Sequence, residues 1–462
     1  MKQNNSVSWN PDLIRRYDLA GPRYTSYPTA PQFEESFSRA DMEAAIGRSN
    51  QAGRPLSLYF HIPFCDTICY YCACNKIVTA NKKHARPYLD TLYQEMNVLA
   101  ALVDQDRLVD QLHWGGGTPT FISDDEKREL MARTRQLFRL RDDDKGEYSI
   151  EVHPGGVSPG SIGVLREIGF NRLSMGIQDF DPQVQEAVNR FNSVEEVRAL
   201  VEAAREQGFH SLSMDLIYGL PKQTVASINS TLDKVIALSP DRLSVFNYAH
   251  LPHLFKTQRQ IDETTLPSPL EKLTMLEQLI QRLTEAGYVY IGMDHFAKPN
   301  DELTLAQERG NLQRNFQGYS THGNCDMFAF GVSSISAIDN IFVQNHKDIK
   351  DYSRSIEEGF LPIARGLTLT ADDQLRQHVI RELICQFSLD FAAIEQLFNI
   401  DFRQYFADEL GALQELVKDG LLEIQPDRIT VNTEGRLLIR RICMVFDAYL
   451  NQSPQIRYSR II

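Results

Sequence analysis

Hydrophobic and polar positions alternate between two kinds of segment from residue 56 to about residue 297. Short apolar runs with little polar alternation are typical of strands that are covered on both faces. Between them, apolar residues recur every three or four positions, as along one face of a helix. The predicted strands are 57–62, 111–115, 148–152, 172–177, 211–218, 242–248 and 288–293. Because strands and helices alternate, the pattern predicts a parallel sheet that right-handed crossovers curl into a partial or full βα barrel.

Helices are expected between these strands and beyond them. In the barrel region the helical spacing covers 88–102, 124–140 with Asp124 as N-cap, 194–207, 224–238 and 269–286. Beyond residue 370 it covers 373–385, 392–398, 403–419 and, after two short strands at 421–424 and 429–431, a last helix at 433–450. Helices followed by a hairpin are typical of a winged-helix-like module, which is either a structural cap on the barrel or a DNA-binding element.

The first fifty residues have little apolar periodicity. Prolines 22 and 28 stand among alternating aromatic residues, which favours an extended arm. The arm either packs over a surface or forms a lid over a pocket, with Arg23 reaching an anion. We therefore predict three parts: an N-terminal arm or lid at 1–50, a βα barrel with an extension at 51–370, and a mostly helical C-terminal domain at 371–462.

Charge and composition narrow the class of protein. The chain has 462 residues, with 48 Lys and Arg against 61 Asp and Glu, so its net charge of −13 repels nucleic acid and anionic membranes. The polar N-terminus has no signal-peptide pattern, and no apolar run approaches the ~18 residues of a membrane span. Four of the seven cysteines fall within ten residues, which is unlike a disulfide framework. We expect a reduced, cytoplasmic protein.

The clustered cysteines are the strongest chemical signal. Cys65, Cys69 and Cys72 form a C-x₃-C-x₂-C run directly after the first predicted strand, and Cys74 follows two residues later. Thiolates are the ligands that iron–sulfur clusters take, and three ligands on a cubane leave one iron open for a substrate. The alternative is a structural zinc site that uses all four cysteines, although its spacing is crowded for tetrahedral zinc.

Other polar and glycine residues lie where predicted strands end. Gly115-Gly116-Gly117 follows the second strand, Glu151 ends the third, Gln178 follows the fourth, and Asp215 lies in the fifth. Chemistry in βα barrels collects at the carboxyl ends of strands, so we expect one site there. Glycines admit a close backbone approach to a ligand, and the carboxylates can accept from ribose hydroxyls or an ammonium group.

The cysteine spacing, with Tyr71 before the third cysteine, resembles the signature of the radical S-adenosylmethionine (SAM) enzymes. Further motifs are similar to those of a narrower family, the oxygen-independent coproporphyrinogen III oxidases. They are PRYTSYP at 22–28, CxxxCxxCxCNK at 65–76, LHWGGGTPT at 112–120, FNRLSMG at 170–176, DLIYGLP at 215–221 and NFQGY at 315–319. The resemblance covers nearly the whole chain and implies a radical SAM partial (β/α)6-type barrel.

This resemblance implies a [4Fe–4S] cluster and two SAM molecules in one site. The implied cluster ligands are Cys65, Cys69 and Cys72, but not Cys74. The implied contacts of the cluster-bound SAM are Tyr59, Gly116, Glu151 and Ile335. Those of the second SAM are Tyr71, Gly117, Thr118, Gln178, Arg190, Asp215 and Ala249. His153 stands where the family pattern leads us to expect aspartate, and no side chain is assigned as a catalytic group.

The implied reaction is the oxidative decarboxylation of two propionates of coproporphyrinogen III to vinyl groups, giving protoporphyrinogen IX. Its partners would be an electron donor for the cluster and a terminal electron acceptor, with the chain a monomer that binds neither nucleic acid nor a membrane. Candidate anchors for substrate carboxylates are Arg23, Lys298, Arg309 and Arg314. One alternative is a haem-chaperone-like relative without decarboxylase activity, and another is a structural iron–sulfur or zinc protein that acts as a regulator.

Overall fold

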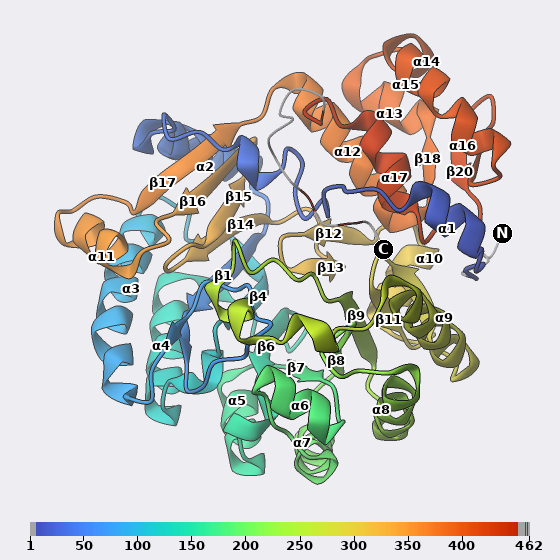
Figure 1. Cartoon of the computed structure of the whole chain (residues 1–462). Helices are drawn as coiled ribbons and strands as arrows, with labels where there is room; N and C mark the ends of the chain where they lie inside the picture. Colours follow the sequence, from blue (N-terminus) through green and yellow to red (C-terminus); the bar gives the residue numbers. More distant parts are fainter. Residues whose placement is uncertain (1–5, 451–457, 459, 461–462) are drawn as a thin grey trace. The chain divides into compact units, whose positions relative to one another are not determined.

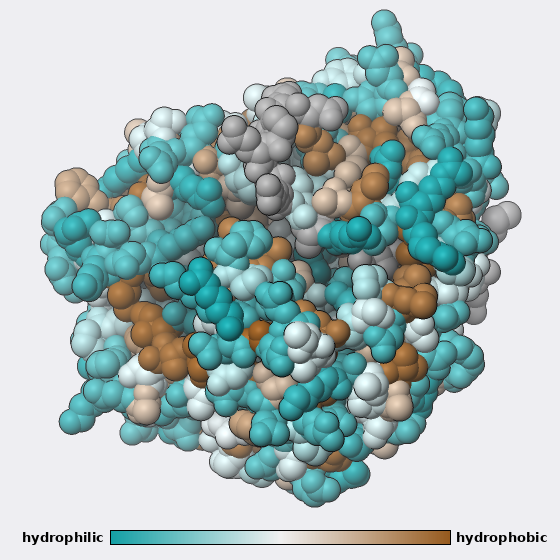
Figure 2. All heavy atoms as spheres, viewed as in Figure 1, coloured by the Kyte–Doolittle hydropathy of each residue, from teal (hydrophilic) through white to brown (hydrophobic). Residues whose placement is uncertain are grey.

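The computed structural model describes residues 6–450, 458 and 460. The chain divides into two compact units. We call Phe33–Leu279 with Asn324–Thr368 the barrel unit, and Met1–Gln32, Ile280–Gly323 and Leu369–Ile462 the terminal unit. None of the described helices is both long enough and apolar enough to span a bilayer. On the face shown in Figure 2, hydrophilic side chains cover most of the surface and apolar patches lie scattered between them.

Six parallel strands form the core of the barrel unit, in the order β1, β4, β6, β7, β8, β9. Their bounds are β1 (Leu56–Ile62), β4 (Leu108–Gly116), β6 (Glu147–Val152), β7 (Arg172–Gln178), β8 (Ser211–Tyr218) and β9 (Arg242–Asn247). The helices of this region are α3 (Ala85–Ala100), α4 (Asp124–Leu137), α5 (Pro159–Ile168), α6 (Pro182–Val188), α7 (Val194–Glu206), α8 (Val225–Leu238) and α9 (Pro269–Glu285). Figure 1 shows α3, α4, α5, α7 and α8 along the outer side of the strands. The prediction of a partial (β/α)6-type barrel is therefore confirmed.

The sheet continues past β1 with strands from later in the chain. β14 (Asp326–Phe330) pairs in parallel with β1, and three antiparallel strands follow it. These are β15 (Ile335–Ile338), β16 (Ile341–Asn345) and β17 (Ile363–Thr368), accompanied by α2 (Arg39–Ala52) and α11 (Ile349–Glu357). The short β5 (Arg139–Leu140) pairs with β4 instead. Beside β1 the further parallel strand is β14, and the antiparallel strands that follow it extend the sheet instead of closing the barrel.

Side-chain alternation along the strands separates the core from the site. On β8, Leu212, Met214 and Leu216 are fully buried, whereas Asp215 lies on the opposite face between them. Successive residues of a strand point to opposite faces, so the apolar set packs under the helices and Asp215 points into the barrel. The same alternation on β6 buries Ile150 and places Ser149 and Glu151 on the inner face.

The terminal unit contains the two ends of the chain and a segment between them. It has α1 (Pro11–Tyr17), β10 (Val289–Gly292), β11 (His295–Ala297), α10 (Glu302–Glu308), β12 (Gln313–Asn315) and β13 (Gly318–Ser320). Its C-terminal part has α12 (Ala371–Gln386), β18 (Ser388–Asp390), α13 (Phe391–Phe398), α14 (Phe402–Tyr405), α15 (Ala407–Ala412), α16 (Gln414–Lys418), β19 (Leu422–Ile424), β20 (Arg428–Val431) and α17 (Ile439–Cys443). The β18–β20–β19 sheet beside these helices matches the predicted winged-helix-like module. The three-part division of the chain stays a prediction.

Several predicted elements were wrong in detail. The strand at 288–293 is an antiparallel hairpin of β10 with β11, because Gly292 and Met293 both adopt positive φ and reverse the chain. Helix α4 is capped by Ser123, whose Oγ accepts from Glu126 N–H in a capping box, so Asp124 is the first helical residue. That helix ends at Leu137, and residues 139–140 form β5 against β4.

Two predicted C-terminal helices are also interrupted. The 403–419 helix is three short helices, because the backbone of buried Phe406 leaves the helical region at φ −104° and ψ 31°. The 433–450 helix shrinks to α17 and one 3₁₀ turn. A Cβ at Gly435 would lie 2.1 Å from Leu421 O, so this position packs tightly against the chain before β19 and lies in a turn.

Candidate active site

The cysteine loop (residues 63–76) follows the carboxyl end of β1. β2 (Phe64–Cys65) pairs in parallel with β3 (Ile77–Val78), which closes the loop. Val188 O at the end of α6 accepts from Tyr70 N–H at 3.0 Å, and Gln258 Nε2 donates to Tyr71 O at 3.1 Å. The ring of Tyr71 packs against an apolar cluster around Val188. The rest of the barrel unit therefore fixes the cysteine loop from two sides.

Two of the three predicted ligand thiols contact polar donors. Thr118 Oγ1 donates to Cys65 Sγ at 3.5 Å, and Arg190 Nη1 donates to Cys69 Sγ at 3.5 Å. Among the described residues, no three His, Cys, Asp or Glu side chains are grouped around a single metal position. A cubane binds each thiolate at a different iron. The three thiols, two of which accept from Thr118 and Arg190, fit a [4Fe–4S] cluster.

The third thiol has a distinct electrostatic setting. A hydrogen bond from Cys74, together with the nearby Lys76 ammonium, lowers the pKa of Cys72 to about 6. Lys76 Nζ also donates to Cys72 O at 3.1 Å. A lowered pKa favours the thiolate, the form in which cysteine binds iron. In this structure the hydrogen bond from Cys74 thus stabilises the thiolate form of Cys72.

The three glycines after β4 meet three different steric demands. A Cβ at Gly117 would lie 2.5 Å from Pro63 O, so glycine lets this turn pass against the start of the cysteine loop. Gly116 has φ +120°, a conformation that other residues rarely adopt. A Cβ at Gly115 would lie 3.1 Å from both Glu151 Oε1 and His113 Nε2. Close packing within the protein is thus one reason for this glycine run. The predicted close approach of the backbone to a ligand is a second, separate reason.

The predicted carboxylates lie on neighbouring strands inside the barrel. The Glu151 side chain is 45% exposed, and its Oε1 lies 3.3 Å from His113 Nε2. Asp215 is partly buried, and Ser174 Oγ donates to its Oδ2 at 3.4 Å. Burial, followed by the nearby charge of Glu151, raises the pKa of Asp215 to about 6. Two carboxylates on the same inner face concentrate negative charge there, which favours the binding of a cationic ligand.

Gln178 and Arg190 form a second part of the site. A Cβ at Gly176 would lie 2.7 Å from Arg190 Nη2 and 2.9 Å from Gln178 Nε2, so both side chains reach the same strand position. Gln178 has φ +67°, and its Oε1 is buried without a hydrogen-bond partner among the described residues. An orphaned buried acceptor that faces a predicted ligand site indicates a missing donor. Arg190 itself donates to Gly176 O and Cys69 Sγ.

The remaining predicted contacts lie at three places around the barrel. Tyr59 lies on β1, and its hydroxyl is 3.1 Å from His61 Nδ1. Ala249 follows β9, and its carbonyl accepts from Gln258 Nε2 at 3.2 Å. Ile335 begins β15, on the other side of β1 from β4. All predicted contacts lie in the barrel unit, but their individual roles toward SAM stay predictions.

His153 departs from the expected aspartate without adding a charge. Burial, with a smaller contribution from the Arg190 guanidinium, lowers the pKa of His153 to about 3. Its Nδ1 accepts from Gly155 N–H at 3.2 Å. A neutral imidazole therefore stands beside Arg190, where an aspartate would have brought a negative charge.

The four candidate carboxylate anchors lie in the terminal unit, and the guanidinium groups of Arg23 and Arg314 are already engaged. Arg23 Nη1 lies 3.1 Å from Asp294 Oδ2. Arg314 Nη1 donates to Arg23 O at 3.0 Å and to Tyr24 O at 2.7 Å, so Arg314 holds the arm in place. Lys298 and Arg309 flank α10, where Thr304 Oγ1 donates to Lys298 O. Arg23, with a partly exposed side chain, remains the strongest of the four candidates.

Comparison with known proteins agrees with these observations. The Radical SAM superfamily model matches residues 59–235, and the HemN C-terminal domain model matches 369–438. The chain is 53% identical to the oxygen-independent coproporphyrinogen III oxidase of Pseudomonas aeruginosa and 50% identical to that of Escherichia coli, each over 99% of this chain and at least 99% of the relative.

A solved structure gives the same result. The structure described as coproporphyrinogen III oxidase (HemN) from Escherichia coli, a radical SAM enzyme, superposes with a TM-score of 0.92 at 49% identity, and the match covers 96% of this chain and all of that one. The chain belongs to the oxygen-independent coproporphyrinogen III oxidases. Membership in the radical SAM superfamily implies a [4Fe–4S] cluster and SAM, and the three thiols beside Thr118, Arg190 and Lys76 fit that cluster.

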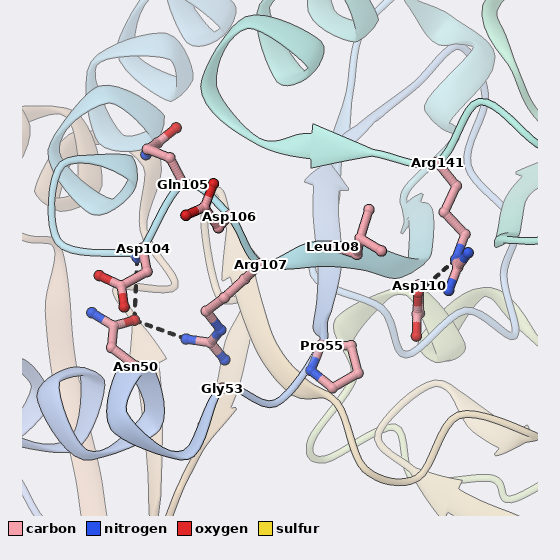
Figure 3. A pocket seen from close by; sticks show the side chains of 10 residues that line it. All are labelled: Asn50, Gly53, Pro55, Asp104, Gln105, Asp106, Arg107, Leu108, Asp110 and Arg141. Atoms are coloured by element: carbon pink, nitrogen blue, oxygen red, sulfur yellow. Dashed lines mark hydrogen bonds and ion pairs between the residues drawn. The ribbon is translucent and has the colours of Figure 1, made fainter.

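The predicted site lies at the carboxyl ends of the barrel strands, and a second hollow must be distinguished from it. Figure 3 shows a cavity of about 540 Å³ beside the first residues of β1 and β4. Both of its arginines are already engaged: Arg107 donates to Asn50 Oδ1 at 2.9 Å, and Arg141 lies 2.6 Å from Asp110. The hollow lies at the opposite strand ends from the cysteine loop, so we assign it no part in the chemistry.

Two polar residues of the site, His113 and Ser149, were not predicted from the sequence. His113 and Ser149 face each other on paired positions of β4 and β6, with Ser149 Oγ 2.5 Å from His113 Nδ1. Each has apolar neighbours on both sides in its strand, where a single polar residue gives no signal by itself. The position of His113 two residues before the glycine run was the available clue, but only the strand register brings it to Ser149.

Proposed function

We propose that this chain is an oxygen-independent coproporphyrinogen III oxidase of haem biosynthesis. Relatedness to the Pseudomonas aeruginosa enzyme, 53% identity over 99% of this chain, carries the proposal. The cysteine loop and the inward-facing carboxylates at one end of the barrel support it independently. The reaction converts two propionate side chains of coproporphyrinogen III into vinyl groups and gives protoporphyrinogen IX.

Cys65, Cys69 and Cys72 hold the cluster in this proposal, and one iron stays open for SAM. When bound, the cluster and SAM supply a 5′-deoxyadenosyl radical. The overall change at each propionate would be the loss of one hydrogen atom from the β-carbon, of CO₂ and of one electron to an acceptor, which leaves the vinyl double bond. The protein's own part is to bind, orient and exclude water, because a primary radical also attacks solvent-exposed groups.

Two SAM molecules occupy the site in our proposal. Glu151, with Tyr59, Gly116 and Ile335, contacts the SAM at the cluster. Gln178, Arg190 and Asp215, with Tyr71, Gly117, Thr118 and Ala249, contact the second. The buried Gln178 Oε1 without a partner supports a donor from a ligand at that position. We further propose that the chain acts as a cytoplasmic monomer that receives electrons from a separate donor and passes them to a terminal acceptor.

An anaerobic incubation tests the function. Cluster-reconstituted protein, SAM, a reductant, an electron-accepting extract and coproporphyrinogen III are followed by mass spectrometry for tetrapyrroles and 5′-deoxyadenosine. Protoporphyrin and 5′-deoxyadenosine are expected together, and Cys69→Ser should abolish both. If 5′-deoxyadenosine forms while the propionates stay intact, the radical chemistry is retained but the substrate assignment fails, as in a haem-chaperone-like relative.

A further inference from the structure

Three polar side chains form a hydrogen-bonded chain across β4 and β6. His113 Nδ1 lies 2.5 Å from Ser149 Oγ, and His113 Nε2 lies 3.3 Å from Glu151 Oε1. His113 and Ser149 are paired in register, and Glu151 is two residues further along the same face of β6. The His113 imidazole therefore lies between Ser149, its register partner on β6, and the carboxylate of Glu151 near the end of that strand.

The chemistry of the three groups fixes the direction of both hydrogen bonds. A carboxylate only accepts, so the ring proton must be on Nε2, from which it is donated to Glu151 Oε1. In the neutral imidazole Nδ1 is then an acceptor, and the Ser149 hydroxyl donates to it. Ser149 thus selects the tautomer that His113 needs in order to bind Glu151.

Two neighbours keep the imidazole in this orientation. The Tyr59 ring stacks on it, with centroids 5.8 Å apart and planes 11° from parallel. Gly115 leaves the space that the His113–Glu151 pair occupies, since a Cβ there would lie 3.1 Å from both partners. The His113 side chain is 13% exposed, whereas that of Glu151 is 45% exposed. A shielded imidazole therefore holds one oxygen of a carboxylate whose other oxygen can meet a ligand.

We propose that His113 is a positioning residue for Glu151, with Ser149 as its tautomer lock. His113 fixes the carboxylate so that Glu151 Oε2 accepts from the ammonium or ribose hydroxyls of SAM. The inference rests on the proposed contact between Glu151 and SAM. It requires no contact between His113 and SAM, and none between His113 and the tetrapyrrole.

The test measures SAM binding by calorimetry to the reconstituted protein with an oxidised cluster, without reductant or coproporphyrinogen III. Its outcome is therefore independent of whether the tetrapyrrole assignment holds. His113→Leu should weaken SAM binding roughly tenfold, the value of a lost charge-assisted hydrogen bond. His113→Gln keeps an N–H near the Nε2 position and should recover much of the affinity. Ser149→Ala should weaken binding roughly threefold, as expected for a neutral hydrogen bond.

The double variant separates positioning from a direct effect. If His113 acts through Glu151, His113→Leu should add little to the loss already caused by Glu151→Gln. His210→Leu is the matched control, because His210 forms a similar pair with Asp144 at 2.9 Å, beside the start of β8 and away from the site. It should leave SAM affinity unchanged.

Three outcomes would overturn the inference. One is wild-type affinity in His113→Leu while Glu151→Gln binds weakly. Another is a double variant, His113→Leu with Glu151→Gln, whose loss of SAM binding free energy equals the sum of the losses in the two single variants. If His113→Leu does not retain its cluster, Ser149→Ala decides the matter: wild-type SAM affinity in Ser149→Ala removes the tautomer lock and with it the proposal.

Discussion

Single side-chain atoms decide whether the turn after β4 can pass the cysteine loop. The closest approach is at Gly117, where a Cβ would lie 2.5 Å from Pro63 O, a backbone atom that cannot rotate away. Gly117→Ala must therefore shift the start of the loop that carries Cys65. We expect reconstituted Gly117→Ala to hold clearly less iron and sulfide per chain than wild type.

A matched glycine provides the control for that measurement. Gly163 lies within α5, and a Cβ there would meet nothing within 4 Å. Gly163→Ala should keep the full cluster content and gain up to about 1 kcal/mol of stability from helix propensity. Full iron and sulfide content in Gly117→Ala would show that the turn can move without cost to the loop.

Asp215 gives the site a pH dependence. Burial and the nearby Glu151 charge raise its pKa to about 6, so protonation removes its charge below that pH. If the carboxylate binds the second SAM, affinity should rise with pH through about 6 and fall by up to ~10-fold per pH unit below it. Calorimetric titrations from pH 5 to 8 measure this, and Asp215→Asn should flatten the profile. A wild-type profile already flat across pH 6 would contradict the role.

Arg23 is the anchor candidate that can change partners. Its guanidinium lies 3.1 Å from Asp294, and both side chains are partly exposed, so a substrate carboxylate can compete for the same donors. Arg23→Ala should raise the KM for coproporphyrinogen III about tenfold, since charged hydrogen bonds contribute roughly 1.5–3 kcal/mol. Arg15→Ala, at an exposed pair with Asp12, is the control. An unchanged KM removes Arg23 from the list of anchors.

At the scale of elements, α3 organises the strand ends next to the cysteine loop. Glu95 is fully buried in this helix and accepts from Gly331 N–H at 2.8 Å, Tyr352 OH at 2.6 Å and Asn345 Nδ2 at 2.6 Å. Tyr88, two turns earlier, donates to His61 O at 2.6 Å. One helix thus ties the turn that precedes β15 to the end of β1.

Burial of the Glu95 carboxyl group makes the stability of the protein depend on pH. Burial raises the pKa of Glu95 to about 7, so its protonated form is favoured in the folded state. Its contribution to stability is complete below the unfolded pKa of about 4.5 and is lost as pH rises through about 7, a change on the order of 3 kcal/mol. Glu95→Gln cannot ionise, so its apparent melting temperature should lack this decline between pH 5 and 8.

A second carboxylate on the same helix serves as the control for Glu95. Asp90 is exposed and pairs with Arg86 at 2.6 Å, so Asp90→Asn should keep the wild-type pH profile. If Glu95→Gln shows the same decline as wild type, the ionisation of Glu95 does not produce it.

Features that depend on neighbouring residues in the sequence could be predicted, whereas features that depend on contacts between distant residues could not. β8 was predicted to the residue, because an apolar-rich segment bounded by turn residues is a local signal. The helix at 433–450 failed because the tight contact of Gly435 with Leu421 O is not local. For the site, strand ends located Glu151 and Asp215, whereas the His113–Ser149 pair depends on strand register, which periodicity alone cannot supply.

At the scale of the whole molecule, charge opposes the DNA-binding alternative for the C-terminal module. The net charge is −13, and two of the module's arginines, Arg436 and Arg440, are buried in the terminal unit. Arg440 is 5% exposed and donates to Pro22 O at 2.9 Å, while Arg436 is 8% exposed and donates to Ser6 O at 3.1 Å. Neither guanidinium is presented as a phosphate-binding stripe would require.

We therefore expect the full chain to pass through a column of immobilised duplex DNA without retention. Binding to phosphates depends on cationic contacts that release counterions, so a true nucleic-acid site gives retention at low salt that falls steeply as salt increases. Loading at about 50 mM salt and eluting with a gradient measures this dependence, with a basic DNA-binding domain as the positive control on the same column. Retention of the chain that vanishes with salt would show a cationic surface elsewhere on the molecule, because the buried Arg436 and Arg440 cannot supply it.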